Sequence, residues 1–289
     1  MSANTPKPLV SINSLSSIFR GFCSVIFAVS ALIPCSNTTA QTTYQIDFET
    51  DQDGNPMTAG VTDLRVVNPY NELFGTASGV HLSTNSPSNR PLNLYDSEGT
   101  GGADTDLERS HGGTGDWDGG NLTATVLGQP EGYILENLLI INTNTNISVP
   151  NDHGSGGTLT LNFDIALSSF GFEFVDLDSG LNATLVFTNT ATSNSQSISF
   201  ADFEQGSGSI HETPNVLFGD RHANRVLGIE ASELGLAQFD KVDFVMTSSG
   251  GIGTVEFQTV PEPSSAILLL FAGFYLLSAR RPRTQPQAR

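Results

Sequence analysis

Apolar and polar residues alternate with a period of two along most of the chain between residues 41 and 260. This period places successive side chains on opposite faces of a β-strand. The longest examples are Thr158–Ile165, Phe170–Leu177 and Leu181–Thr190. Shorter segments of the same character are Tyr44–Glu49, Leu122–Leu127, Glu136–Asn142, Ser197–Phe200, Arg225–Glu230, Lys241–Met246 and Thr254–Phe257. The pattern predicts an all-β fold, an antiparallel β-sandwich or jelly roll.

The three longest strands also predict which side chains face the core. These side chains are Leu159, Leu161, Phe163, Ile165, Phe170, Phe172, Phe174, Leu185 and Phe187. Gly, Asn, Asp and Ser cluster between the strands, as turns require. One short helix is expected at Ala231–Phe239, and no internal repeat is present.

The first 40 residues do not follow this pattern. Two basic residues precede an apolar run, Gly21–Pro34, which is short for a membrane span and leads into small residues before Gln41. These features predict a signal peptide, residues 1–40, removed by signal peptidase. Both cysteines, Cys23 and Cys35, would leave with it, so the mature protein could contain no disulfide. The alternative is a lipoprotein signal in which Cys35 is acylated.

The C-terminal end carries an uncharged segment, Ser264–Ala279. As a helix it would rise about 24 Å, a little less than a hydrocarbon core. Pro263 suits the start of such a helix, and the arginines that follow it suit a cytoplasmic end. We therefore expect a single transmembrane helix at 264–279, embedded in the inner membrane, with a buried core helix as the alternative.

The same segment resembles the PEP-CTERM sorting signal of Gram-negative bacteria. The resemblance rests on a Pro-Glu-Pro tripeptide, an apolar helix and an arginine cluster: Pro261, Glu262 and Pro263, then Arg280, Arg281 and Arg283. It implies recognition by an exosortase, a membrane-anchored intermediate, and final placement on the cell surface or in the extracellular matrix. The implied organisation is a signal peptide (1–40), an extracellular domain (41–258) and a sorting signal (259–289).

Charge is unevenly distributed along the 289 residues, whose formal net charge is −18. Residues 41–260 hold six basic and 29 acidic residues, a net charge of −23. Such a surface repels nucleic acids and anionic lipids and attracts cations. We expect no nucleic-acid partner.

Aspartates concentrate in a glycine-rich stretch, Leu94–Asn121, and in three shorter groups. Calcium takes six to eight oxygen ligands, which carboxylates and loop carbonyls supply. The predicted calcium ligands are Asp96, Asp104, Asp106, Asp152, Asp178 and Asp47. In one of the shorter groups, Asp51 and Asp53 begin like an EF-hand loop that lacks its final glutamate. The alternative for all these acids is a solvated surface turn.

The chain between Asp47 and Gly180 is also similar to an extracellular β-domain found in many PEP-CTERM proteins. The matching stretches are YDSEGTGGADTDL, ENLLIIN, PNDHGSGGTLTLNFD and FGFEFVDLD, against the pattern NPTGGDxDL, GNVLII, a DD loop with GGT, and a closing DxD. Asp96, Asp104 and Asp106 fall on the acids of that pattern, whereas Asn151 replaces the first acid of the DD pair. Calcium is inferred from the aspartates and not from this resemblance.

Catalytic motifs are absent from the sequence: it contains no HExxH, GxSxG, P-loop or GxGxxG pattern. The leading hypothesis is therefore a non-enzymatic surface or matrix protein that acts in extracellular polysaccharide or in adhesion. The alternatives are a carbohydrate-active enzyme, a glycosidase or lyase with a carboxylate pair, and a structural protein without a specific ligand. Trp117, between Asp116 and Asp118 on a predicted exposed loop, is a candidate sugar contact; the other possibility is that it folds onto the core.

Overall fold

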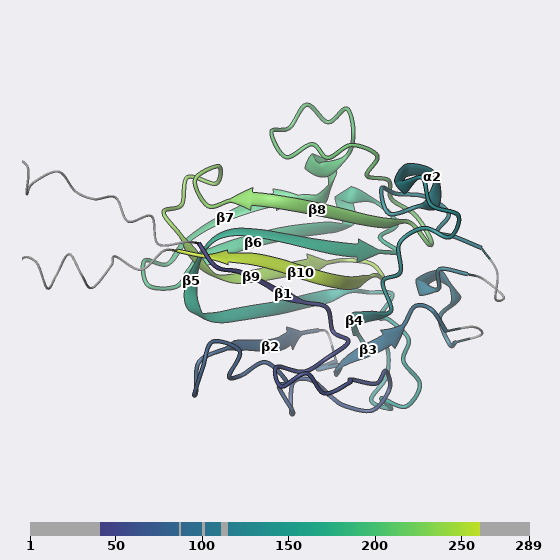
Figure 1. The fold of residues 1–289 in the computed structure, drawn as a ribbon, viewed down its shortest axis with the longest axis horizontal. Helices are drawn as coiled ribbons and strands as arrows, with labels where there is room; N and C mark the ends of the chain where they lie inside the picture. The colour runs from purple at the N-terminus through teal and green to yellow at the C-terminus, as the bar shows by residue number, and fades with distance from the viewer. Residues whose placement is uncertain (1–40, 87, 100–101, 111–114, 261–289) are drawn as a thin grey trace, which may run out of the picture. The chain divides into compact units, whose positions relative to one another are not determined.

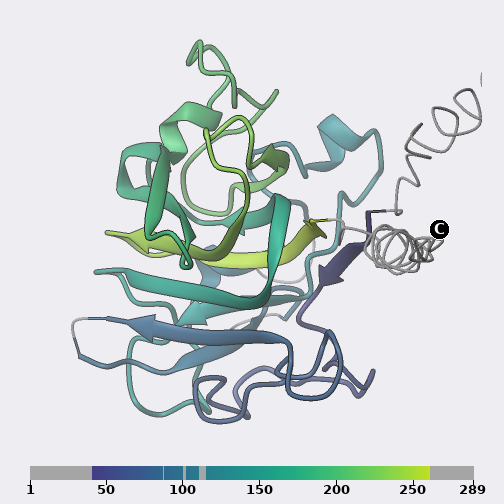
Figure 2. The same ribbon diagram turned by 90° about the vertical axis from the view of Figure 1, so that its left-hand side faces the viewer.

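Antiparallel strands dominate the structure, as the alternation predicts. The computed structural model describes residues 41–86, 88–99, 102–110 and 115–260, which lie within one compact unit, Ala40–Pro261. They form a ten-stranded sheet in the order β3-β4-β10-β5-β9-β6-β7, in which β1 pairs with β10, and β2 and β8 pair with β5. Figure 1 shows the strands side by side, and Figure 2 shows that the sheet curls. The prediction of an antiparallel all-β fold is confirmed.

The strand bounds are β1 (Thr43–Ile46), β2 (Val80–Asn85), β3 (Leu92–Asp96), β4 (Asn137–Ile141), β5 (Gly157–Val175), β6 (Ala183–Asn189), β7 (Asn194–Ser199), β8 (Ala223–Glu230), β9 (Phe239–Met246) and β10 (Gly251–Thr259). The short helices are η2 (Thr105–Leu107), α2 (Ala124–Leu127), η3 (Gly180–Asn182) and η4 (Phe200–Phe203).

Strand β5 joins two expected strands into one of 19 residues. Its first half pairs with β2 and β9, and its second half pairs with β8 and β10. Between Asn162 and Leu167 the register with β9 shifts. The shift changes the parity of the inward side chains, from Leu159, Leu161 and Phe163 to Phe170, Phe172 and Phe174. Both halves can therefore contribute to the same core.

The main core is aromatic and lies on the inner face of the curled sheet. Phe172 is its centre: the ring centroids of Phe200, Phe203 and Phe244 lie 5.4, 5.9 and 5.2 Å from its own, in tilted or edge-on arrangements. Such geometries suit the quadrupoles of aromatic rings. All four side chains are at most 1% exposed.

A smaller cluster packs against the outer face of the sheet. Its members are Tyr95, Leu107, Trp117, Leu122, Leu135, Leu138, Ile140, Val175 and Ala223, with Tyr133 partly buried against them. Because Val175 ends β5 and Leu107 belongs to η2, this cluster fastens the glycine-rich loop to the sheet.

Two local predictions are wrong. The segment expected to be a helix, Ala231–Phe239, forms turns and then enters β9, since Gly235 adopts a φ of +67° that a helix does not allow. The strand expected at Leu122–Leu127 instead contains helix α2. Thr123 caps its first turn by accepting from the Val126 amide, and Gly128, with a φ of +69°, ends it.

The predictions for the two termini fall on residues outside those that the structure describes. These are the signal peptide (1–40), the sorting residues Pro261, Glu262, Pro263, Arg280, Arg281 and Arg283, and the transmembrane helix 264–279. Within the described ranges, every helix is too short or too polar to span a bilayer.

Replacing Phe172 by alanine should remove the centre of the aromatic core. Cavity formation of this kind costs about 3–5 kcal/mol of unfolding free energy. Urea unfolding measures the loss. Val66→Ala, at a side chain that is 79% exposed, is the matched control and should stay within about 0.5 kcal/mol of the parent. Equal effects of the two substitutions would contradict this description of the core.

Candidate functional site

Three aspartates from distant parts of the chain meet beyond the end of β5. Asp104 is the N-cap of η2, and its Oδ1 accepts a hydrogen bond from the Asp106 amide. Asp152 is placed by an isolated antiparallel bridge to Asn142. Asp176 directly follows the last residue of β5 and has a φ of +63°. We call Asp104, Asp152 and Asp176 the aspartate cluster.

Asp104 and Asp152 are in direct contact, and Asp176 lies near enough for the charges to influence one another. The backbone amide of Asp152 donates to Asp104 Oδ2 at 3.2 Å, and the amide of Gly250 donates to Asp152 Oδ2. Asp152 is 6% exposed and Asp176 is 3% exposed. Oδ1 of Asp176 is buried and has no hydrogen-bond partner among the described residues. A buried carboxylate oxygen without a donor is costly, because it loses its hydration and gains nothing in return.

The electrostatics of the cluster favour protonation when no cation is present. Burial raises the pKa of Asp152 to about 9, and the negative charges of Asp104 and Asp176 add to this increase. Burial likewise raises the pKa of Asp176 to about 8, with further contributions from Asp104, Asp106 and Asp220. Ionising the cluster therefore requires a compensating positive charge.

The donor chemistry of the aspartate cluster fits a hard cation. Carboxylate oxygens suit calcium or magnesium, whereas zinc prefers nitrogen and sulfur ligands. However, nowhere in the described part of the chain do three acidic, histidine or cysteine side chains already converge as a ready-made metal site. The cluster therefore combines an unpartnered oxygen of Asp176 with raised pKa values of Asp152 and Asp176, without a complete set of ligands.

The six predicted calcium ligands fall into three groups. Asp104 and Asp152 lie in the aspartate cluster. Asp106 and Asp178 are exposed and lie close enough for their charges to raise the pKa of Asp176. Asp96 and Asp47 lie elsewhere: each uses its Oδ1 to accept two backbone amides of the turn that follows it. Their carboxylates close local turns, as aspartates commonly do.

The set of calcium ligands predicted from the sequence does not include Asp176 or its neighbour Asp220. The alternation in the sequence does not account for the burial of Asp176. It follows the last residue of β5 with a φ of +63°, and Leu177, not Asp176, joins Phe170, Phe172 and Phe174 in the main core. The position of Asp220 is not readable from the sequence either, because it lies in a turn far away in the chain.

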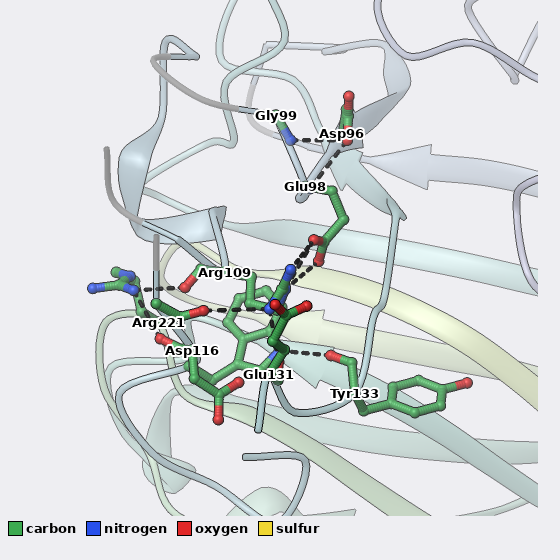
Figure 3. Close-up of polar contacts among 10 residues, drawn as sticks. Asp96, Glu98, Gly99, Arg109, Asp116, Glu131, Tyr133 and Arg221 are labelled. Carbon is green, nitrogen blue, oxygen red and sulfur yellow. Dashed lines mark hydrogen bonds and ion pairs between the residues drawn. The ribbon is translucent and has the colours of Figure 1, made fainter. Parts of the chain in front are cut away.

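Two arginines tie together the loops that carry Glu98, Asp116 and Glu131 (Figure 3). Arg109 forms an ion pair with Glu98 at 2.6 Å and donates to the carbonyl of Glu131. Arg221 donates to three backbone carbonyls, those of Glu108, Arg109 and Asp116. It also pairs with Asp118 at 3.1 Å. A planar guanidinium can satisfy several acceptors at once, so these two side chains replace regular secondary structure here.

Of the two possibilities for Trp117, the structure supports the one in which the indole folds onto the core, and not the exposed sugar contact. The side chain is 4% exposed and packs in the outer cluster. Its Nε1 donates to the carbonyl of Tyr133 at 3.1 Å. Burial of the indole leaves no free face against which a sugar ring could stack.

A cavity lined in part by Tyr95 of the outer cluster has a volume of about 760 Å³. Glu49 and Glu136 line it together with Asn137 and Tyr95. Glu49 accepts from the Asn137 amide at 2.6 Å. Burial raises the pKa of Glu49 to about 7, and a side-chain hydrogen bond with Glu136 adds to the increase. The two carboxyl groups are thus in direct contact.

Arg221→Ala should loosen the loops without unfolding the sheet. Hydrogen bonds from a charged donor contribute about 1.5–3 kcal/mol, and three of those lost here are to the carbonyls of Glu108, Arg109 and Asp116. We expect faster exchange of the Arg109 and Asp118 amides, which bond to the Ser97 and Arg221 carbonyls, and little change in β5. Arg65→Ala removes a comparable ion pair to Asp63 and should leave the exchange of these two amides unchanged; if both variants act alike there, Arg221 has no special role.

Comparisons with known proteins give little further information. No family model matches the chain, and no curated protein does. Among solved structures, the chain is similar to variants of CBM29-2, a family 29 carbohydrate-binding module. Two single-residue variants are each 12% identical, covering 44% and 46% of this chain and 74% and 80% of theirs, with a TM-score of 0.26. A third, complexed with mannohexaose, is 10% identical over 44% of this chain and 74% of its own, also at 0.26. A likeness of this size carries no conclusion about fold or ligand.

Proposed function

We propose that this chain is an exported, non-enzymatic β-sandwich protein of the cell surface or extracellular matrix whose loops are stabilised by calcium. The observation that carries the calcium role is the aspartate cluster. Asp104, Asp152 and Asp176 approach one another from three segments, and a buried Asp176 oxygen has no partner. A cation would supply the positive charge that the six basic residues between 41 and 260 are too few to provide.

Calcium would be held by Asp104, Asp152 and Asp176, with Asp106, Asp178 and Asp220 contributing negative potential around it. Its charge would offset the desolvation of the buried carboxylates and keep them ionised. Because these residues come from the glycine-rich loop, the loop before β5 and the end of β5, binding would join three loops. A protein without cysteine in its mature form would gain in this way a cross-link that does not need a disulfide.

The cellular address rests on the sequence. The Pro-Glu-Pro tripeptide, apolar segment and arginine cluster support handling by an exosortase after signal peptidase, with an anchored intermediate in the inner membrane. The sandwich or jelly-roll form is supported by β5, which pairs with β2 and β9 in one half and with β8 and β10 in the other.

We favour a role without catalysis over a glycosidase, because the carboxylate pair that would best suit a glycosidase, Glu49 and Glu136, has the wrong arrangement. Glycosidases hold their two carboxyl groups about 5 Å apart or more, with the sugar or a water between them. Glu49 and Glu136 instead hydrogen-bond to each other. The remaining alternative, a structural protein without a ligand, is separated from our proposal by the response to calcium.

Calcium should raise the melting temperature of the purified protein relative to a chelator. At a concentration of 100 times Kd, a ligand contributes about 2.7 kcal/mol, which for a domain of this size corresponds to several degrees. Asp152→Asn and Asp176→Asn should each remove most of the shift. Thermal unfolding followed by circular dichroism measures it.

The matched control for this experiment is Glu204→Gln, which removes one exposed carboxylate far from the cluster in sequence. It should keep the full calcium shift. A parent protein that unfolds at the same temperature in chelator and in millimolar calcium would exclude the calcium role.

In chelator, the free energy of unfolding should fall as the pH rises from about 5 to 8. Asp152 and Asp176 have pKa values near 9 and 8 when folded and 3.8 when unfolded. In this window the native state binds protons that the unfolded state has released, so stability decreases with pH, by up to about 1.4 kcal/mol per pH unit for each retained proton. Urea unfolding at several pH values measures the slope.

Calcium should flatten that slope, because it stabilises the ionised form. Asp152→Asn should flatten it even in chelator. Glu49→Gln should change it only below about pH 7, where the Glu49 carboxyl titrates. Stability that increases with pH across this window would show that the cluster is not protonated in the native state.

A further inference from the structure

A small pocket opens on the outer face of the sheet, away from the aspartate cluster. Its volume is about 220 Å³. The side chains that matter come from β1, β5, β8, β10 and the loop before β4: Gln45, Tyr133, Glu173, Arg225, Leu227 and Glu256. We call it the Tyr133 pocket.

Strand register explains why these polar side chains share one face. Gln45 lies opposite Glu256, which lies opposite Gly171 on β5. One pair further along, Glu173 lies opposite Arg225. The residues between them in sequence point into the core, so these point outward. Gly171 leaves the middle of the row without a side chain, and a Cβ there would lie 3.0 Å from Leu227 Cδ2. Gly171 therefore leaves a gap in the row of outward side chains.

An ion pair between the buried Glu173 and the partly exposed Arg225 lines the pocket. Glu173 is 1% exposed and accepts from Nε of Arg225 at 2.7 Å, while its second oxygen accepts from the Thr254 amide at 3.2 Å. Burial raises the pKa of Glu173, and the Arg225 charge opposes this increase. Buried ion pairs seldom add to stability when compared with apolar side chains. The position of the Glu173–Arg225 pair beside an open pocket suits recognition of a ligand.

The aromatic wall of the pocket is held rigidly. The guanidinium of Arg225 lies 4.6 Å from the ring centroid of Tyr133. Trp117 Nε1 and the Leu122 carbonyl fix the backbone of Tyr133 at 3.1 and 3.2 Å. Asn121 fixes the backbone of Arg225 through two hydrogen bonds, at 2.7 and 2.8 Å. A preorganised site loses less entropy when a ligand binds.

The lining matches the two surfaces of a sugar ring. Leu227 is 56% exposed and, with the Tyr133 ring, offers apolar surface for C–H groups. Gln45, Arg225 and Glu256 offer donors and acceptors for hydroxyl groups. Glu256 and the net charge of −23 over residues 41–260 disfavour anions.

We infer that the Tyr133 pocket binds a neutral sugar residue of a polysaccharide, with Tyr133 and Leu227 against the ring and Arg225, Gln45 and Glu256 at its hydroxyl groups. The inference deepens the matrix role proposed above by naming a ligand class and a site. Trp117 contributes to this site indirectly, because its Nε1 donates to the carbonyl of Tyr133 and so positions that residue.

The test is a calorimetric titration of the full-length protein, in calcium, with cellohexaose, mannohexaose and laminarihexaose, and with oligogalacturonate as the anionic comparison. At least one neutral hexasaccharide should bind and oligogalacturonate should not. Tyr133→Ala and Leu227→Asp should each weaken binding about tenfold or more. Val66→Ala, an exposed apolar residue elsewhere, is the control and should bind as the parent does.

The inference is overturned if no neutral hexasaccharide binds, if oligogalacturonate binds better, or if both pocket variants bind as the parent does. Melting temperatures measured beside each titration show that the variants are folded. They also separate the two proposals, because the pocket variants should keep the calcium shift. A calcium shift without sugar binding leaves the calcium role standing and removes this inference, and sugar binding without a calcium shift does the reverse.

Discussion

The structure depends on the change of parity in β5. A strand with one fixed parity would turn the phenylalanines of its second half toward solvent, since a shift of one residue exchanges the two faces. The irregular register between Asn162 and Leu167 corrects this, so that Phe163 and Phe170 both reach the core. Four other strands take their pairing from the two halves of β5. Further register shifts with β8 and β10 adjust the second half, so the irregularities of β5 together set how its neighbours pair.

Scarcity of positive charge is the second constraint. Among residues 41–260, Arg65, Arg109, Arg221, Arg225 and Lys241 each form an ion pair with an acid. Far more acids than cations remain, and those at the end of β5 are buried. The arginines are placed where they also hold loops or line a pocket. The buried aspartates must therefore take up protons or a metal, which connects the composition of the protein directly to its loops.

The sequence predicted the features that depend on local periodicity. It predicted eight of the ten strands, all except β2 and β3, and most of the inward side chains of β5 and β6, because a period of two is written in neighbouring residues. It named Asp104 and Asp152 among six ligands from separate groups, but not that these two would meet. It could not predict that Asp96 and Asp47 would close their own turns, or that Asp220 would approach Asp176, because these depend on where distant loops meet. Trp117 was misplaced for a similar reason: its loop composition is polar, but the outer face of the sheet needed an apolar cover.

The burial of Trp117 has a practical consequence. It is the one tryptophan in the sequence, and it lies between the sheet and the loops that carry the aspartate cluster and the Tyr133 pocket. Its indole is shielded from water, and the tryptophan fluorescence of the protein comes from this one position. The protein thus contains an intrinsic fluorophore that reports on loop packing without any label, at the junction between the two proposed sites.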